Sequence, residues 1–399
     1  MSNPDKKSLS IIMLVLVLII GATYGISFFA RGYQISTKGK VSFLATGIIS
    51  ATSKPKGASV YIDEKLITAT DDTINLPPKE YTIKIVKDGY LPWQKTIQVK
   101  KEIVYQTDTQ LFRSAPDLKP VTLTGAINPS VSPNNSLVIF SVASASAVKD
   151  NGLYLLGLND GPSFLIKNQP KQLSSNLPNI DWSKFTFTFS PNSKQVLAKN
   201  ITNNVNYLIN LDNSTDYKNL YDVTAKLSLI KEEWNAQEQQ IIKAKIISLP
   251  IEIQALISTN SAKNIVFNSD ETKVLYLAQI NGNLKKDLIS PPPAQSTQNQ
   301  VRDIKKDNYY VYDLKDGTNF LIGSKDLYNL NWLANSNNLV YVEDQKIQTV
   351  EYDNTNKQTL FAGNFNKDAV YPWLDGNKII TLTAPYSNAQ ENLYSISVR

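Results

Sequence analysis

The sequence contains no cysteine and no histidine in 399 residues. Without cysteine the chain forms no disulfide and offers no thiolate as nucleophile or metal ligand. Without histidine, Ser-His-Asp and Cys-His catalysis are excluded, together with the commonest neutral metal ligand. Any chemistry must use carboxylates, lysine, tyrosine, serine or backbone groups. We therefore predict no catalytic, cofactor-binding or metal-binding residue, and we interpret the chain as a protein other than an enzyme.

Charge is also scarce and only weakly biased. The chain carries 41 Lys and Arg against 35 Asp and Glu, a net charge of +6. A nucleic-acid-binding surface needs basic residues clustered on one face with stacking aromatics, and no such cluster occurs, so we predict no nucleic-acid partner. The 20 Tyr and 13 Phe favour sheets over helices.

One long run has no charge at all: residues 9–30, LSIIMLVLVLIIGATYGISFFA. At about 1.5 Å per residue it spans a hydrocarbon core of about 30 Å. We predict a cytoplasmic tail over 1–8 and a transmembrane helix over 9–30 that binds the lipid bilayer. Two alternatives remain open: a buried helix, and a cleaved signal peptide, whose site after Ala22 would place Ile20 where a small residue is expected.

The orientation of this helix follows from the size of what comes after it. Two lysines precede the run and three basic residues, Arg31, Lys38 and Lys40, follow it, which disagrees mildly with an inside N-terminus. Long domains translocate regardless of such counts. We expect a single-pass plasma-membrane protein whose C-terminal domains are extracytoplasmic.

After a predicted stalk over 31–47, residues 48–113 alternate apolar and polar positions between turns, which predicts a small β-sandwich. Pro55–Asp63 reads PKGASVYID and resembles the signature of PEGA domains, with Lys56 where that family has Glu. The resemblance implies a surface-exposed β-module, often near membranes or cell walls, without established catalytic residues. Tyr90 and Trp93 are expected to hold the last strand on the core; a binding platform is the alternative.

From residue 120 to 399 a degenerate unit recurs: an apolar residue, a polar turn and an apolar strand. Its Ser-Pro-Asn and Asn-Ser-Asp tetrads are predicted to form hairpin turns. The pattern resembles the TolB-like and WD40-like propeller repeats of bacterial envelope proteins. We predict a mainly β fold with a β-propeller of about five blades; a sixth, between 212 and 262, stays open. The five copies begin at Val131, Phe189, Phe267, Trp332 and Trp373.

Closure of the ring is predicted from its last copy. That copy ends after its third strand, so its sheet lacks an outer strand. Residues 120–124, before the first copy, form a spare strand. We expect this strand to pair with the last blade and close the ring.

Two insertions interrupt the repeats. Residues of about 224–258 are rich in helix formers, with Leu227, Ile230, Trp234 and Ile241 at helical spacing, and predict a helical cap or a docking element. Residues of about 284–306 include SPPPAQSTQNQ and predict a disordered, exposed loop, with a proline-motif ligand as the alternative.

Together these features predict a membrane-anchored cell-envelope protein for binding or scaffolding, with an envelope protein or cell-wall polymer as partner. The alternative is a carboxylate-dependent polysaccharide hydrolase or lyase, with two carboxylates assembled from distant blades. A carboxylate cluster at the channel mouth would favour the hydrolase. Four aromatics are candidates for ligand contact, although each is expected to be core: Trp182, Tyr207, Trp332 and Trp373.

Overall fold

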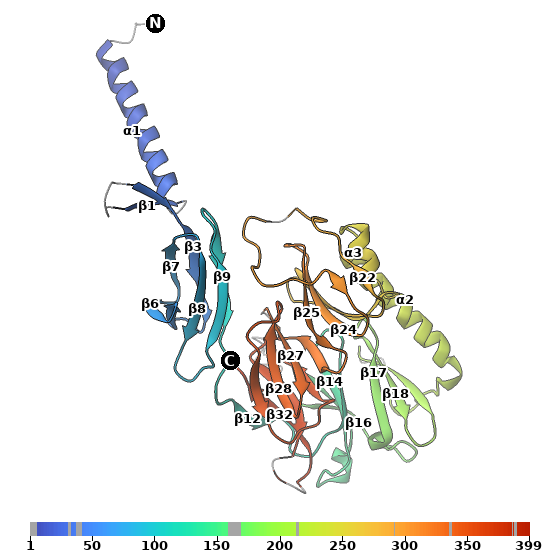
Figure 1. The fold of residues 1–399 in the computed structure, drawn as a ribbon. Coiled ribbons are helices and arrows are strands. Elements are labelled where there is room, and N and C mark those ends of the chain that lie inside the picture. Colours follow the sequence, from blue (N-terminus) through green and yellow to red (C-terminus); the bar gives the residue numbers. More distant parts are fainter. Residues whose placement is uncertain are drawn as a thin grey trace. The chain divides into compact units, whose positions relative to one another are not determined.

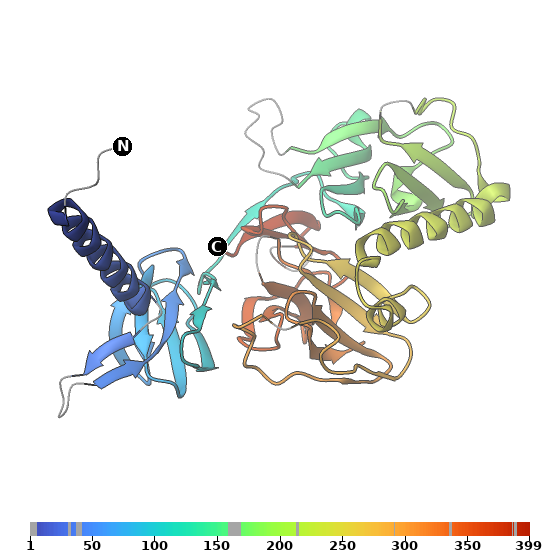
Figure 2. The same ribbon diagram turned by 90° about the horizontal axis from the view of Figure 1, so that it is seen from above.

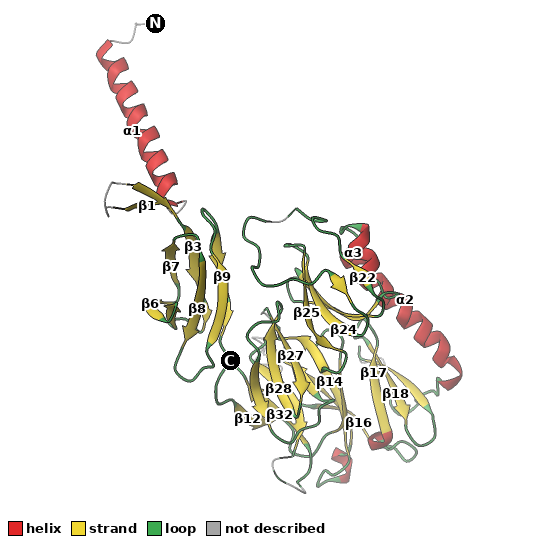
Figure 3. Ribbon diagram, viewed as in Figure 1, coloured by secondary structure: helices red, strands yellow, loops and turns green. Residues whose placement is uncertain are grey.

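The computed structural model describes residues 6–30, 33–36, 42–158, 169–212, 215–290, 292–334, 337–384, 386 and 389–399. The chain separates into two compact units. The first is Met1–Leu111 with Pro292–Gln298, and the second is Phe112–Pro291 with Asn299–Arg399. Strands are the main regular secondary structure (Figure 3), so the predicted mainly β fold is confirmed.

Helix α1 (Lys6–Ala30) opens the first unit (Figure 1). Its window Ser10–Ser27 has a mean hydropathy of 2.3 and no buried share, so it is long and apolar enough to cross a membrane. The predicted stalk over 31–47 contains more structure than expected. β1 (Tyr33–Ser36) and β2 (Ser42–Ala45) pair antiparallel, and β3 already begins at Gly47.

A two-layer sandwich follows. One sheet has the order β6-β5-β8-β9, and the other has the order β10-β3-β7, with β11 paired to β4. The pairings of β10 with β3 and of β11 with β4 are parallel. The strands are β3 (Gly47–Ala51), β4 (Ser53–Lys54), β5 (Ser59–Ile62), β6 (Lys65–Ala69), β7 (Asp72–Leu76), β8 (Glu80–Val86), β9 (Trp93–Gln98), β10 (Val104–Gln106) and β11 (Thr109–Gln110).

The alternation of the sequence decides which side chains fill this sandwich. Val60, Ile83 and Ile85 are fully buried, whereas the residues that alternate with them along β5 and β8 are more exposed. Trp93 is 2% exposed in the same core, and the partly buried Tyr90 packs against this core. Both aromatics therefore hold the last strands on the core, as predicted, and do not form a binding platform.

Within the described residues, the second unit contains five antiparallel sheets of three or four strands, numbered 1 to 5 along the chain. Figure 2 shows them arranged around a common centre. Sheet 1 is β13 (Ile127–Val131), β14 (Leu137–Val142), β15 (Gly152–Gly157) and β16 (Lys171–Ser175). Sheet 2 is β17 (Phe185–Phe189), β18 (Gln195–Asn200) and β19 (Asn206–Asn210). Sheet 3 is β20 (Ala262–Phe267), β21 (Lys273–Ala278), β24 (Asn308–Asp313) and β25 (Thr318–Ser324). Sheet 4 is β26 (Tyr328–Trp332), β27 (Asn338–Glu343), β28 (Lys346–Glu351) and β29 (Gln358–Ala362). Sheet 5 is β30 (Val370–Pro372), β31 (Lys378–Thr383), β32 (Asn392–Ser397) and β12 (Asp117–Pro120).

The outer strand of sheet 5 comes from the start of the unit. β12 pairs antiparallel with β32, from Asp117 opposite Ser397 to Pro120 opposite Tyr394. Strand closure is as predicted, but the paired segment lies earlier than residues 120–124. Beyond Pro120 the regular ladder stops, because the Thr122 hydroxyl, rather than a main-chain carbonyl, accepts from the Leu393 amide at 2.9 Å.

Sheets of the ring pack face to face through shared hydrophobic cores. Sheet 5 packs on sheet 1, sheet 1 on sheet 2, and sheet 3 on sheet 4. The second face of sheet 3 differs, because it packs on α2 (Leu227–Ile246) and α3 (Ile251–Leu256) within the part of the chain described. In Figure 2, α2 lies on the side of the ring between sheets 2 and 3.

The helical insertion thus has a definite packing role. Ile242 and Ile246 of α2 and Ile253 of α3 are buried against sheet 3. The helical spacing of the sequence predicts that Ile241 lies on the apolar face of the helix. Ile241 is instead 38% exposed and its neighbour Ile242 is buried, because sheet 3 meets α2 one position further along the helix. Short 3-10 turns occur at η1 (Val148–Asp150), η2 (Trp182–Lys184) and η3 (Thr224–Lys226).

The prediction of a disordered loop over 284–306 is wrong at both ends of the segment. β22 (Gly282–Asn283) pairs with β23 (Asp303–Ile304). Leu284 and Ile304 are buried in the core of sheet 3 and the helices. Their apolar side chains anchor a segment whose polar middle dominated its composition.

Candidate functional site

The inner strand of each sheet is the edge strand that lies nearest the common centre of the five sheets. The inner strands are β13, β17, β20, β26 and β30. Two cavities lie along these inner strands. One is bounded by the strands' C-terminal ends and the turns after them, and is called the hairpin cavity. The other is bounded by the N-terminal parts of β13, β17, β26 and β30, and is called the bulge cavity. Val131 lines both, so the two cavities occupy opposite ends of the same strands.

The hairpin cavity has a volume of about 770 Å³. This lies within the range of about 300–1,000 Å³ typical of small-ligand pockets. All five inner strands and α2 contribute to its wall. Apolar and aromatic side chains form most of the lining: Val131, Phe189, Ile241, Ile242, Val266, Phe267, Trp332 and Trp373.

The polar turns at this end are built alike, which explains the repeated tetrads. In sheet 1, Ser132 Oγ accepts from the Leu137 amide at 3.0 Å, and in sheet 2, Ser190 Oγ accepts from the Gln195 amide at 2.9 Å. In sheet 3, Asn268 Oδ1 accepts from the Lys273 amide at 2.8 Å. These residues are hairpin turns, as predicted, and the turns also form the rim of the hairpin cavity.

Helix α2 contributes the charged side chains of this cavity. Lys245 Nζ lies 2.7 Å from Glu271 Oε1 and 4.9 Å from the centroid of the Phe267 ring. Glu238 lies about two turns further back on the helix and also lines the cavity. The helix therefore adds one cation, already paired, and one anion to a lining whose other described residues are uncharged.

The four aromatics predicted as candidates divide between two places. Trp332 and Trp373 line the hairpin cavity, 4% and 2% exposed. Trp332 Nε1 donates to the Val266 carbonyl at 2.9 Å, which joins sheet 4 to sheet 3. Trp182 and Tyr207 instead pack in the core between sheets 1 and 2, where both flank Phe185.

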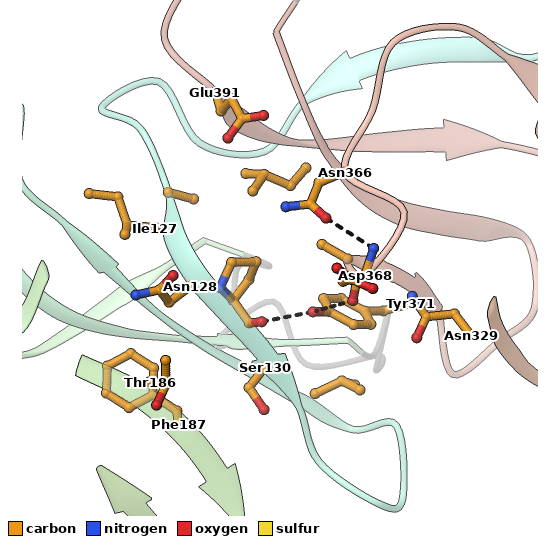
Figure 4. A pocket seen from close by; sticks show the side chains of 15 residues that line it. Ile127, Asn128, Ser130, Thr186, Phe187, Asn329, Asn366, Asp368, Tyr371 and Glu391 are labelled. Carbon is orange, nitrogen blue, oxygen red and sulfur yellow. Dashed lines mark hydrogen bonds between the residues drawn. The ribbon is translucent and has the colours of Figure 1, made fainter. Parts of the chain in front are cut away.

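The bulge cavity has a volume of about 560 Å³ and a more polar lining (Figure 4). Two inner strands bend into it through β-bulges. The register of β13 shifts between Ile127 and Ser130, and that of β26 shifts between Tyr328 and Asn331. A bulge re-aims the side chains around it, and here it places Asn128 and Asn329 on the cavity wall.

Both asparagines adopt the left-handed conformation, with φ of 48° for Asn128 and 49° for Asn329. Asparagine tolerates this region better than other residues with a Cβ. Asn128 Nδ2 donates to the Phe185 carbonyl at 2.9 Å, and Asn329 Nδ2 donates to the Lys367 carbonyl at 2.6 Å. The first bond joins sheet 1 to sheet 2, the second joins sheet 4 to the segment leading into sheet 5, and each leaves the side-chain carbonyl oxygen available.

Tyr371 closes the floor of the bulge cavity. Its hydroxyl donates to the Pro129 carbonyl at 2.8 Å (Figure 4). Burial raises the pKa of Tyr371 well above its usual value, and the nearby charge of Asp368 acts in the same direction. The phenol therefore stays neutral at physiological pH and acts as a donor that links sheet 5 to sheet 1.

Two carboxylates line the bulge cavity, Asp368 and Glu391, and both are exposed. Figure 4 shows them apart, with Asn366 between them. Within the described residues, no group of three or more Asp or Glu side chains is arranged to hold a metal ion.

Sequence reasoning missed the bulge asparagines. Their signal was the residue three positions before the start of a repeat: Asn128 before Val131, Asn264 before Phe267 and Asn329 before Trp332. All three have positive φ, and β20 carries the same register shift at Asn264.

Comparison with known proteins matches part of the chain to a family. The PEGA domain matches residues 46–114, which confirms the predicted resemblance. No curated protein is significantly similar in sequence. Similar solved structures include a putative TolB from Agrobacterium tumefaciens, 12% identical, with a TM-score of 0.22, covering 68% of this chain and 78% of the other. An acylaminoacyl peptidase from Pyrococcus horikoshii is also 12% identical, with a TM-score of 0.21 and coverage of 70% of this chain and 39% of the peptidase.

Proposed function

We propose that the chain is a membrane-anchored binding protein of the cell envelope, whose ring takes an apolar segment of a partner protein into the hairpin cavity. One observation carries the proposal: five inner strands and α2 converge on a single cavity with an apolar lining and a polar rim. Pockets of this composition bind through the apolar wall and orient the ligand with a few polar groups.

The chemistry of the lining favours a polypeptide segment over a cell-wall polymer. Ile241, Phe267 and Leu374 offer partly exposed apolar surface, which the apolar side chains of a polypeptide segment can cover. Lys245 is already paired with Glu271, so an ionic ligand would have to compete with that pair. The turn residue Asn134, exposed at the rim, is placed to hydrogen-bond the main-chain groups of a peptide.

Anchoring rests on α1. Its apolar window has no buried share, and Ile11, Leu14 and Leu18 are 62%, 62% and 63% exposed. Apolar surface of this extent is costly in water, and a bilayer would cover it. The chain has no cysteine, so a single cysteine placed at exposed Asp344 would report which side of the membrane the ring occupies. Labelling of intact cells by an impermeant maleimide is expected; labelling only after lysis would contradict the proposed topology.

The alternative function, that of a polysaccharide hydrolase or lyase, has less support. Hydrolysis needs one carboxylic acid held protonated, which burial in an apolar site normally provides. Among the described residues that line the hairpin cavity, Glu238 is the only one with a carboxylate. The carboxylates of the bulge cavity, Asp368 and Glu391, are exposed. Binding is therefore the better supported function.

The test compares two substitutions on the same helix. Ile241 lines the hairpin cavity and is 38% exposed, whereas Leu229 is 64% exposed and lies outside the cavity. Full-length wild type, Ile241→Glu and Leu229→Glu, each in lipid nanodiscs, are used to capture partners from solubilised envelope fractions. We expect the wild type and Leu229→Glu to retain the same protein and Ile241→Glu to lose it. Equal retention by both variants would contradict the proposed site.

A further inference from the structure

We propose that the bulge cavity is a second binding site, separate from the hairpin cavity, which takes an organic cation, the ammonium or guanidinium group of a free amine or of a basic side chain. The cavity is large enough for such a group, at about 560 Å³. Side chains of sheets 1, 2, 4 and 5 surround it, so a rigid framework positions the polar atoms (Figure 4).

The first argument is the direction of the hydrogen bonds. Asn128 uses its side-chain amide as donor to the Phe185 carbonyl of sheet 2, and Asn329 donates in the same way to the Lys367 carbonyl, in the segment leading into sheet 5. What remains of each for a ligand is the carbonyl oxygen, an acceptor. Tyr371 likewise uses its hydroxyl proton on Pro129. Asn366 is the exception, because its Oδ1 accepts from the Asp368 amide and leaves its NH2 group as a donor.

The second argument is charge. Asp368 and Glu391 line the cavity, and no lysine or arginine is among the described residues that line it. Neither carboxylate has a side-chain hydrogen bond or ion pair to another residue of the described chain. Lys367, the neighbour of Asp368 in sequence, instead lies with Nζ 4.0 Å from the centroid of the Tyr328 ring.

Acceptors and negative charge together select the ligand. An ammonium group brings three donors and a guanidinium brings five, and neither has an acceptor. A neutral sugar would satisfy the acceptors but leave both carboxylates without a counter-charge. An anion would be repelled. The cavity therefore favours a cation with several N–H donors.

The test uses full-length protein in nanodiscs of zwitterionic lipid, so that the membrane itself does not bind the probe. Calorimetric titrations compare 1,5-diaminopentane with uncharged 1,5-pentanediol, and an acetylated lysine tripeptide amide with its alanine counterpart. We expect both cationic probes, or one of them, to bind and both neutral probes to fail. Diaminopentane binding alone would indicate a free amine as ligand, and tripeptide binding alone a basic side chain.

Isosteric substitutions locate the binding. Asp368→Asn and Glu391→Gln remove one charge each, and Asp344→Asn is the matched control at the exposed β27–β28 turn, where φ is 50° and asparagine is well tolerated. Since both carboxylates are exposed, each loss should weaken cation binding by about two- to five-fold. The double variant should lose more than either, and Asp344→Asn should bind as the wild type does.

Three results would overturn the proposal: no cation binding by the wild type, equal binding of the neutral probes, or unchanged affinity in the double variant. Circular dichroism of each variant checks that the fold is retained. Partner capture by the hairpin cavity is measured separately, so either site can fail without the other.

Discussion

Asn128 and Asn329 occupy equivalent positions in two different sheets, and each ties its sheet to the next. Both lie in a bulge of an inner strand with φ near 50°, and both donate the side-chain amide to a main-chain carbonyl of the following sheet or of the segment leading into it. The same two side chains therefore stabilise the ring and shape the acceptor-rich wall of the bulge cavity.

Substitution of Asn128 should destabilise the second unit by two separable effects. Asn128→Ala removes the hydrogen bond to Phe185 and places alanine at φ 48°, at a cost of about 1–3 kcal/mol. Asn128→Gly removes only the bond and should cost about 1 kcal/mol. Urea unfolding measures both. Equal midpoints for wild type and Asn128→Ala would show that the bulge contributes nothing to stability.

Gly376 is expected to resist any side chain. Its φ is 72°, and a Cβ there would lie 2.1 Å from the Ala334 carbonyl oxygen, which belongs to the turn of the neighbouring sheet. Gly317 is the control, because its φ is 64° but its nearest neighbour would be Ile289 Cβ at 3.4 Å. Alanine should cost about 1 kcal/mol at Gly317 and about 3 kcal/mol at Gly376. Thermal unfolding of the two variants would show no difference if the turns of sheets 4 and 5 were not in contact.

Docking of α2 should depend on Ile242. This side chain is 6% exposed between the helix and sheet 3, so Ile242→Ala should cost about 2–5 kcal/mol. Ile247 lies just past the end of α2 and is 62% exposed, and Ile247→Ala should be nearly neutral. Hydrogen exchange of residues 227–246 reports the effect. Exchange as slow in Ile242→Ala as in the wild type would mean that α2 is held by other contacts.

The ion pair of Lys56 with Asp71 predicts a pH dependence in the first unit. Lys56 Nζ lies 2.9 Å from Asp71 Oδ2, and this bond, followed by the Ser53 amide, lowers the pKa of Asp71 below its ordinary 3.8. A lowered folded pKa adds stability above pH 3.8 that is lost as the pH falls through and below that value.

Lys56→Gln should therefore lower the melting temperature slightly at pH 6, and the difference from wild type should vanish at strongly acidic pH. The effect is small because the Lys56 side chain is 83% exposed. Lys65→Gln, an exposed lysine in the same sandwich, is the control and should show no such pH-dependent difference. A constant difference at every pH would exclude the ion pair as its cause. The pair also explains why lysine suits this turn: a glutamate at position 56 would face Asp71 with like charge.

Local patterns predicted much of the fold. Period-2 alternation identified the strands of the sandwich, and the spacing from Val131 to Trp373 identified the five inner hairpins. Pro250 correctly separated the two helices α2 and α3. Each of these features depends on residues that are close together in the sequence, so each could be predicted from the sequence alone.

Pairings between distant residues were not predictable in the same way. The parallel pairing of β10 with β3 joins residues more than fifty positions apart, and no local pattern marks it. Leu284 and Ile304 are two apolar residues at the ends of a polar segment, and only the fold shows that they meet the core of sheet 3. The two cavities arise from five strands at once, so their linings could not be listed from the sequence.

The most direct test of the binding proposal is site-specific photo-crosslinking in living cells. A photoreactive amino acid replaces Ile241, on the wall of the hairpin cavity, or Leu229, exposed on the same helix outside it. We predict one discrete adduct from position 241, abolished by the Trp332→Ala substitution in the cavity wall, and none from position 229. The same adducts from both positions, or an adduct at 241 that survives loss of Trp332, would contradict ligand binding in the hairpin cavity.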